Sequence, residues 1–146
     1  MMLSLPWRYE RRGFAMGMKE NAEVVRNGYD AFAKGDLDTL RELIAADVVW
    51  KVPGKSPLSG DKKGIEATLT YFTQLFELTN GTFKAEPLEV AVGAEHVIVT
   101  QLNSGERKGK KNLQLDGVLV FSFRDGKISG CSEFENDQYS RDEFLS

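Results

Sequence analysis

The sequence contains one cysteine, one histidine and no long apolar run. A single cysteine, Cys131, cannot form a disulfide within the chain, so a reducing compartment such as the cytoplasm is expected. One histidine and one cysteine also leave too few ligands for a typical zinc site. No stretch approaches the roughly 18–20 continuous apolar residues of a membrane span. We therefore expect no metal and no membrane association.

Clustered positive charge is also scarce. Residues 1–19 carry four basic side chains and one acidic one, a net +3, so a total of -3 leaves the remainder at -6. An acidic body argues against a nucleic-acid partner, because phosphate binding depends on clustered Lys and Arg. The basic run at 106–111 is predicted to be a solvated hairpin tip. The sequence also has no glycine-rich phosphate loop and no nucleophile elbow, so no cofactor is expected.

Helical periodicity begins at Asn21. Val25, Gly28, Tyr29 and Phe32 recur at spacings of three and four, which predicts one apolar stripe on a helix. Further helices are predicted over 37–44, 62–78 and 139–145, and a loop over 53–64. Gly35 would end the first helix, Asp36 would cap the second, and Asp137 would cap the last. Residues 1–18 are interpreted as a loosely ordered extension, because Pro6 and Gly13 interrupt a helix, and residues 19–146 as one domain.

After Gly81 the apolar residues recur at every second position, as they do in a strand, instead of at the spacing of a helix. Strands are predicted over 82–92, 95–105, 110–124 and 127–136, with a shorter one near Trp50. The short connections between these strands predict an antiparallel meander, because parallel strands need a long crossover. The fold class is therefore α+β, with helices covering one face of a long, curled sheet. Such a cone is hard to fill with side chains at its wide end, so a small-molecule cavity is expected.

Three segments carry a resemblance to a known family. NGYDAFAKGDLDTLRELIAADVVWKVPG (27–54), PLSGDKKGIEATLTYF (57–72) and VLVFSFRDGKISGCSEFENDQY (118–139) resemble the SnoaL-like branch of the NTF2-like superfamily. The resemblance covers about residues 20–146. It implies a cone-shaped α+β barrel, a pocket between helices and sheet, and a homodimer formed through the outer face of the sheet. Members include polyketide cyclases, ketosteroid isomerases and limonene epoxide hydrolases, so the fold does not fix the function.

Tyr29 matches the tyrosine with which ketosteroid isomerases donate a hydrogen bond to a developing oxyanion. The two carboxyl groups that those enzymes also need fall at Val52 and Leu119, so their mechanism is not expected here. A core tyrosine with a satisfied hydroxyl is the alternative interpretation of Tyr29.

Glu133 lies near the acidic residue of the epoxide hydrolases, which use an Asp-Arg-Asp arrangement. In an apolar pocket its carboxyl group would suit general acid–base chemistry. Asp116 and Arg107 are its candidate partners, although their spacing does not reproduce that motif. Glu135 shares a strand face with Glu133, and the alternative is that both are a solvated pair on an edge strand. His96 is predicted to lie exposed in a turn, and Cys131 to be a buried filler.

Apolar side chains are predicted to line the ligand cavity. They are Trp50, Phe32, Phe72, Phe76, Leu119 and Phe121, with Tyr71 as a further candidate. The leading hypothesis is a protein that binds, and transforms by metal-free acid–base chemistry, a small apolar molecule of polyketide, steroid or terpenoid type. The alternative is a ligand-binding or dimerisation module without catalysis. A sheet with apolar residues on both faces, as around Val118–Phe121, would fit a homodimer interface.

Overall fold

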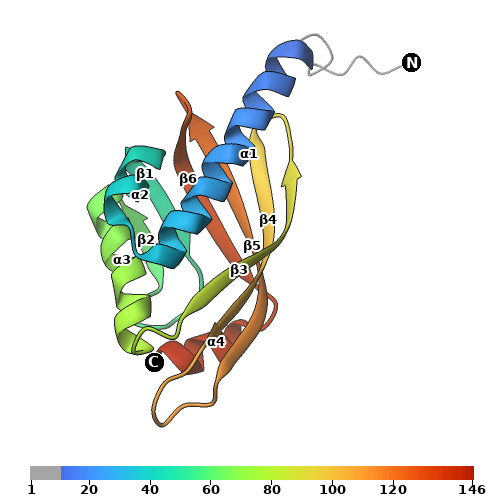
Figure 1. The fold of residues 1–146 in the computed structure, drawn as a ribbon. Coiled ribbons are helices and arrows are strands. Elements are labelled where there is room, and N and C mark those ends of the chain that lie inside the picture. Colours follow the sequence, from blue (N-terminus) through green and yellow to red (C-terminus); the bar gives the residue numbers. More distant parts are fainter. Residues whose placement is uncertain (1–10) are drawn as a thin grey trace.

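The structure is a computed structural model that describes residues 11–146, which form four helices and six strands (Figure 1). In chain order these are α1 (Arg11–Lys34), α2 (Leu37–Leu43), β1 (Ile44–Val52), β2 (Gly60–Lys63), α3 (Ile65–Leu78), β3 (Lys84–Val92), β4 (His96–Gly105), β5 (Leu113–Arg124), β6 (Lys127–Glu135) and α4 (Gln138–Leu145). This order confirms the predicted α+β class. No helix within 11–146 is long and apolar enough to cross a membrane.

The first helix begins earlier than the periodicity predicted. It starts at Arg11 instead of Asn21, so the predicted extension is helical from residue 11, and its residues 1–10 lie outside the described part of the chain. The helix passes through Gly13 because one interior glycine costs only about 1 kcal/mol relative to alanine. Its end agrees with the prediction, since Gly35 follows with a φ of 66°. Asp36 then caps α2 by accepting a hydrogen bond from Thr39 N (3.1 Å).

The strands form one sheet in the order β2-β1-β6-β5-β4-β3. Strands β3 to β6 make the predicted antiparallel meander. Strand β1 runs parallel to β6, and its partner β2 lies within the segment that was predicted to be a loop. Strand β6 is therefore an interior strand with neighbours on both sides. The interpretation of Glu133 and Glu135 as an edge-strand pair is wrong for this reason.

Helices α1, α2 and α3 cover one face of the curved sheet (Figure 1). Along β5 the side chains alternate between the two faces: Leu119 and Phe121 are buried beneath the helices, whereas Val118 and Val120 point outward and are half-buried. Strand β4 alternates in the same way, and Val97, Val99, Gln101 and Asn103 are buried on the inner face. The core, and any site inside it, therefore lies between the helices and the inner face.

Candidate functional site

A cavity of about 60 Å³ lies between the helices and the inner face of the sheet. Trp50, Phe32, Phe72, Leu119 and Phe121 line it, as predicted, together with Tyr71. Typical ligand pockets measure about 300–1,000 Å³, so this one is small. Aromatic rings pack against one another in its wall, and those of Trp50 and Phe72 meet edge to face with centroids 4.9 Å apart.

Phe76 does not line the cavity, which corrects the prediction for that residue. It packs against Phe32 with ring centroids 4.9 Å apart. It lines instead an outer groove between α2 and α3. The reason is helical geometry, because Phe72 and Leu75 face the cavity and Phe76 points about 100° around the helix from Leu75, toward the outer groove.

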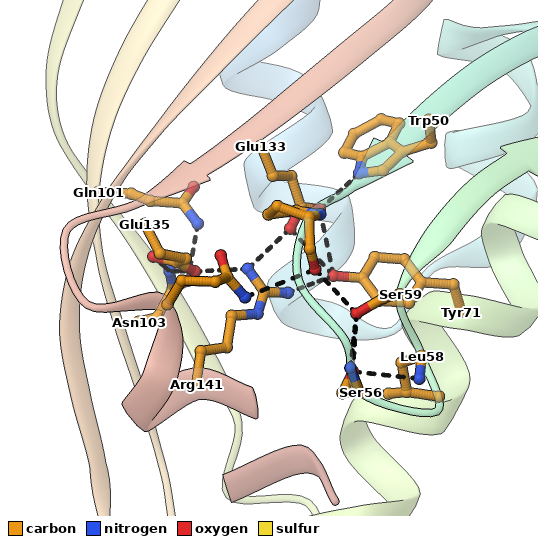
Figure 2. Close-up of polar contacts among 12 residues, drawn as sticks. Trp50, Ser56, Leu58, Ser59, Tyr71, Gln101, Asn103, Glu133, Glu135 and Arg141 are labelled. Atoms are coloured by element: carbon orange, nitrogen blue, oxygen red, sulfur yellow. Dashed lines mark hydrogen bonds and ion pairs between the residues drawn. The ribbon is translucent and has the colours of Figure 1, made fainter. Parts of the chain in front are cut away.

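Glu133 is the acidic group in the cavity wall. Strand β6 directs its side chain inward, and the residue is only 8% exposed. Trp50 Nε1 donates a hydrogen bond to its Oε2 (2.6 Å), and Tyr71 OH donates to its carboxylate (3.0 Å to Oε1). Arg141 Nη1 lies 2.9 Å from its Oε1. Four elements, β1, α3, β6 and α4, therefore meet at one carboxylate (Figure 2).

Arg141 joins this carboxylate to a second one. It lies on α4, is 5% exposed, and forms ion pairs with both Glu133 and Glu135. Its Nη2 also donates to Tyr71 OH (2.6 Å). Arg107 and Asp116 were the candidate partners of Glu133 for an acid–arginine–acid arrangement. The structure builds such an arrangement from Arg141 and Glu135 instead (Figure 2).

Tyr29 belongs to the same polar network. Its hydroxyl donates to Gln101 Oε1 (2.5 Å), and Gln101 Nε2 donates to Asn103 Oδ1 (2.7 Å). Asn103 Nδ2 donates to Glu135 Oε1 (2.9 Å). The chain of hydrogen bonds thus runs from α1 along β4 to the carboxyl cluster. Tyr29 lines the cavity and its hydroxyl is satisfied, as the interpretation of a core tyrosine predicted, whereas its role as a donor to an oxyanion stays a prediction.

Burial sets the protonation of these groups. It raises the pKa of Glu135 from 4.5 to about 7, against the lowering effect of Arg141, while the charge of Glu133 raises it further. Burial also raises the pKa of the Tyr29 hydroxyl well above its usual value, and Cys131 and Glu133 add to this. Tyr29 is therefore a neutral hydrogen-bond donor at any physiological pH.

The remaining candidate residues lie away from the cavity. Asp116 is exposed on the outer face of β5, because its place in the strand alternation is opposite to that of Leu119. Arg107 donates to the carbonyl oxygens of Phe144 (2.7 Å) and Ser146 (3.0 Å) at the end of α4. His96 is exposed beside the β3–β4 turn, as predicted.

The interpretations of Cys131 and Asp137 are confirmed. Cys131 is buried, and burial raises the pKa of its thiol well above the usual value, as expected for an inert filler. Asp137 caps α4 by accepting from Ser140 N (3.1 Å). Within the described residues, no three His, Cys, Asp or Glu side chains are grouped so that they could hold a metal ion.

Sequence reasoning missed Arg141, Gln101 and Asn103. The two amides carried a detectable signal, because they share the strand alternation of the buried Val97 and Val99. Polar residues at buried positions of a strand usually have a specific partner. Arg141 carried no such signal, since a basic residue in a short C-terminal helix is ordinarily exposed.

Comparison with protein families supplies the family. The model of the SnoaL-like domain matches residues 25–130. The chain belongs to the SnoaL-like family. Its fold is accordingly that of the NTF2-like superfamily, and an NTF2-like protein from Burkholderia xenovorans LB400 shares it with a TM-score of 0.72 at 23% identity, over 86% of this chain and 96% of that one.

Two relatives of this SnoaL-like chain are closer in sequence. Bal32a, a protein of known structure from a soil-derived mobile gene cassette, is 40% identical, with a TM-score of 0.86 over 89% of this chain and 99% of that one. The "Uncharacterized protein Rv0034" of Mycobacterium tuberculosis is 30% identical over 123 residues, or 84% of this chain and 93% of its own length. The similarity therefore extends over nearly the whole length of both relatives.

Proposed function

We propose that this SnoaL-like protein binds a small, largely apolar organic molecule in the inner cavity and transfers a proton to or from it. The observation that carries the proposal is the carboxylate of Glu133, buried in the wall of a cavity that is lined mainly by apolar side chains. Burying a charge is costly unless it is paired. A chain that only needed a stable core would be served as well by an apolar residue at this position.

The proposed roles follow from the hydrogen bonds. Glu133 is the acid or base, and Arg141 and Trp50 Nε1 hold its carboxylate in place. The Tyr29 hydroxyl, on the opposite wall, would turn from Gln101 to donate to a ligand oxygen on which charge develops. Hydrogen bonds in so apolar a site are stronger than in water. The chemistry would be of isomerase, cyclase or hydrolase type.

The size of the cavity restricts how a ligand enters. A polyketide-, steroid- or terpenoid-like molecule does not fit in about 60 Å³. Its binding would require the rings of Phe32 and Phe72, which meet edge to face at 5.1 Å, to move apart. We therefore propose that α1 and α3 separate when ligand binds, because they carry these two rings.

A specific observation also favours the second candidate, a binding or dimerisation module without turnover. The Glu133 carboxylate already accepts hydrogen bonds from Trp50 and Tyr71 and pairs with Arg141. A carboxylate so fully satisfied resembles a structural ion more than a base awaiting its substrate. The two candidates differ in what they predict for a bound ligand. An enzyme should turn it over in a way that depends on Glu133, whereas a binding module should bind it without turnover.

The test begins with a thermal-shift screen against polyketides, steroids, terpenoids and lipids. A ligand at a hundredfold excess over its dissociation constant should stabilise the protein by about 2.7 kcal/mol. Turnover of the binding class is then compared in Tyr29→Phe and Glu133→Gln, with the exposed Tyr139→Phe and Glu86→Gln as matched controls.

Loss of turnover by about 10²–10⁴-fold in both cavity variants, with ligand binding retained, is the result expected of an enzyme. Binding without turnover in the parent protein would favour the binding module. Equal turnover in the parent protein and Glu133→Gln would contradict the proposed role of Glu133. Melting temperatures of all four variants show whether a loss reflects chemistry or folding.

We also propose that the protein is a homodimer that pairs through the outer face of its sheet. Leu88, Ile98 and Phe134 are large apolar side chains exposed on the strands of that face, at 56%, 40% and 55%. The helices of the same chain cover only the inner face (Figure 1). A contiguous apolar face of this kind commonly marks a protein interface.

A further inference from the structure

Glu135 occupies an unusual position behind the cavity. It is the next inward residue of β6 after Glu133, yet it does not line the cavity, and its side chain is only 1% exposed. Asn103 from β4 donates to it (2.9 Å), and Arg141 from α4 pairs with it. A buried carboxyl group that never touches the proposed ligand must act, if at all, through its neighbours.

The sheet is shaped to hold this carboxyl group. Gly117 is the partner of Glu135 on β5, and a Cβ atom at that position would lie 2.6 Å from Glu135 Oε2 and 3.1 Å from Asn103 Nδ2. Any side chain there would displace the carboxylate. Glycine in the interior of a strand weakens it, and it often marks the close approach of another group. Here the absent side chain provides the space that Glu135 fills.

Arg141 is the single cation shared by two buried acids. Its Nη1 contacts both Glu133 (2.9 Å) and Glu135, and its Nη2 binds Tyr71 OH (2.6 Å). One positive charge cannot neutralise two carboxylates in a low-dielectric interior. The strength with which Arg141 pairs with Glu133 therefore depends on whether Glu135 carries its charge.

We infer that Glu135 is a positioning residue whose charge sets how strongly Arg141 pairs with Glu133. When the Glu135 carboxyl group is protonated, Arg141 forms an ion pair with Glu133 alone, and the three side chains have a net charge of zero. When Glu135 releases that proton to solvent, Arg141 is divided between two carboxylates and the cluster carries a charge of -1. The consequence for catalysis rests on the proposed function, whereas the titration itself does not.

The surroundings of Glu135 place this change in the neutral range. Burial raises its pKa to about 7 although Arg141 opposes the shift. Its charged or polar neighbours come from every packed element: Glu133 on β6, Asn103 on β4 and Arg141 on α4, with Gly117 the uncharged neighbour on β5. Asp116 and Asn136 lie with it along the outer groove.

Trp50 provides a built-in reporter, because its indole donates directly to Glu133 Oε2 (2.6 Å). The sequence has a second tryptophan, Trp7, and replacing it (Trp7→Phe) leaves Trp50 as the only one. In this background, ligand-free emission should titrate with a midpoint near pH 7. Glu135→Gln, which keeps the shape and removes the ionisation, should abolish that transition.

Two matched controls distinguish the titration of Glu135 from that of other groups. His96→Gln removes the single histidine, which is exposed at the start of β4, and should leave the transition unchanged. Glu86→Gln, an exposed acid on β3, should also leave it unchanged. A parent protein with no transition between pH 5 and 9, or a Glu135→Gln variant that retains it, overturns the inference. Because no ligand is present, failure to find a substrate affects the proposed function and not this result.

Discussion

Arg141 lies among groups that would be costly to bury alone. It is 5% exposed and touches Glu133, Glu135 and Tyr71. Transferring an arginine and two carboxyl groups out of water is unfavourable, and their attraction offsets that cost only when every donor and acceptor has a partner. No buried side-chain nitrogen or oxygen among the described residues lacks a hydrogen-bond partner. The complete satisfaction of this cluster explains how the core tolerates it.

Stability should depend on pH through Glu135. Its pKa rises from 4.5 in the unfolded chain to about 7 in the folded one. An acidic group whose pKa is higher in the folded chain than in the unfolded chain stabilises the fold. This contribution is fully present below the pKa of the unfolded chain, and it is lost as pH rises through the pKa of the folded chain. The free energy of unfolding, measured by urea denaturation, should therefore fall between pH 5 and pH 8.

Glu135→Gln should flatten this fall, whereas Glu86→Gln should not. Asp36, Glu66 and Asp137 all have a lowered pKa because hydrogen bonds favour their charged forms. Their stabilising contributions disappear only at acidic pH, below the range tested. A fall equally steep in the parent protein and Glu135→Gln would show that another group is responsible.

At the scale of elements, α4 carries Arg141 to the cavity and depends on the loop after β1 for its position. Lys55 N donates to Asp142 Oδ2 (3.0 Å), and Gln138 Nε2 donates to the carbonyl oxygen of Pro53 (3.5 Å). Gly54 makes this contact possible, because a Cβ there would collide with both Asp142 and Gln138. The loop that the sequence predicted around two prolines thus holds the helix that completes the site.

Gly54→Ala should destabilise the protein more than Gly60→Ala. Both glycines have a positive φ, 92° and 112°, so both variants bear backbone strain of order 1–3 kcal/mol. Gly60 has nothing within 4 Å of the added Cβ. Gly54→Ala should therefore lower the free energy of unfolding by about 1 kcal/mol more than Gly60→Ala, because it also breaks hydrogen bonds between the loop and α4. This difference measures the contribution of the contact between the loop and α4. Equal losses in urea denaturation would mean that the loop does not position α4.

Within residues 11–146, helices cover one face of the sheet and leave the other uncovered (Figure 1). The helices bury the inner face, while Phe134 and Leu88 remain exposed on the outer one beside the half-buried Val118. A groove on the outer face is lined by these three residues, and Asp116 and Asn136 also line it. A stable dimer buries about 800 Å² on each partner, and a sheet face of this kind could supply such an area.

Phe134→Lys should convert the proposed dimer to monomer. A lysine placed in an apolar interface must lose its hydration without gaining a partner. Sedimentation equilibrium measures the mass, and Tyr139→Lys is the control, because Tyr139 is 90% exposed and lies on α4 instead of the sheet. A dimer that survives Phe134→Lys, or a parent protein that is already monomeric, would refute pairing through this face.

The local pattern of the sequence was enough for most of the fold. Strand alternation gave the meander from β3 to β6 and the buried faces of Leu119 and Phe121, because side-chain direction in a strand follows from residue parity. Caps such as Asp36 and Asp137 were found because capping depends on a few neighbouring residues. Resemblance supplied the family, and also drew attention to Tyr29 and Glu133.

Only the tertiary structure decided which groups meet. Strand β1 pairs with β6 across some 80 residues of chain, and no local pattern records that contact. It makes β6 an interior strand, and so puts Glu133 and Glu135 in the core instead of at an edge. The same long-range packing placed Arg141 between them. The sequence determined the elements and their faces, because those are local properties. The site was decided by the packing of distant elements, because burial and charge pairing depend on what those elements bring together.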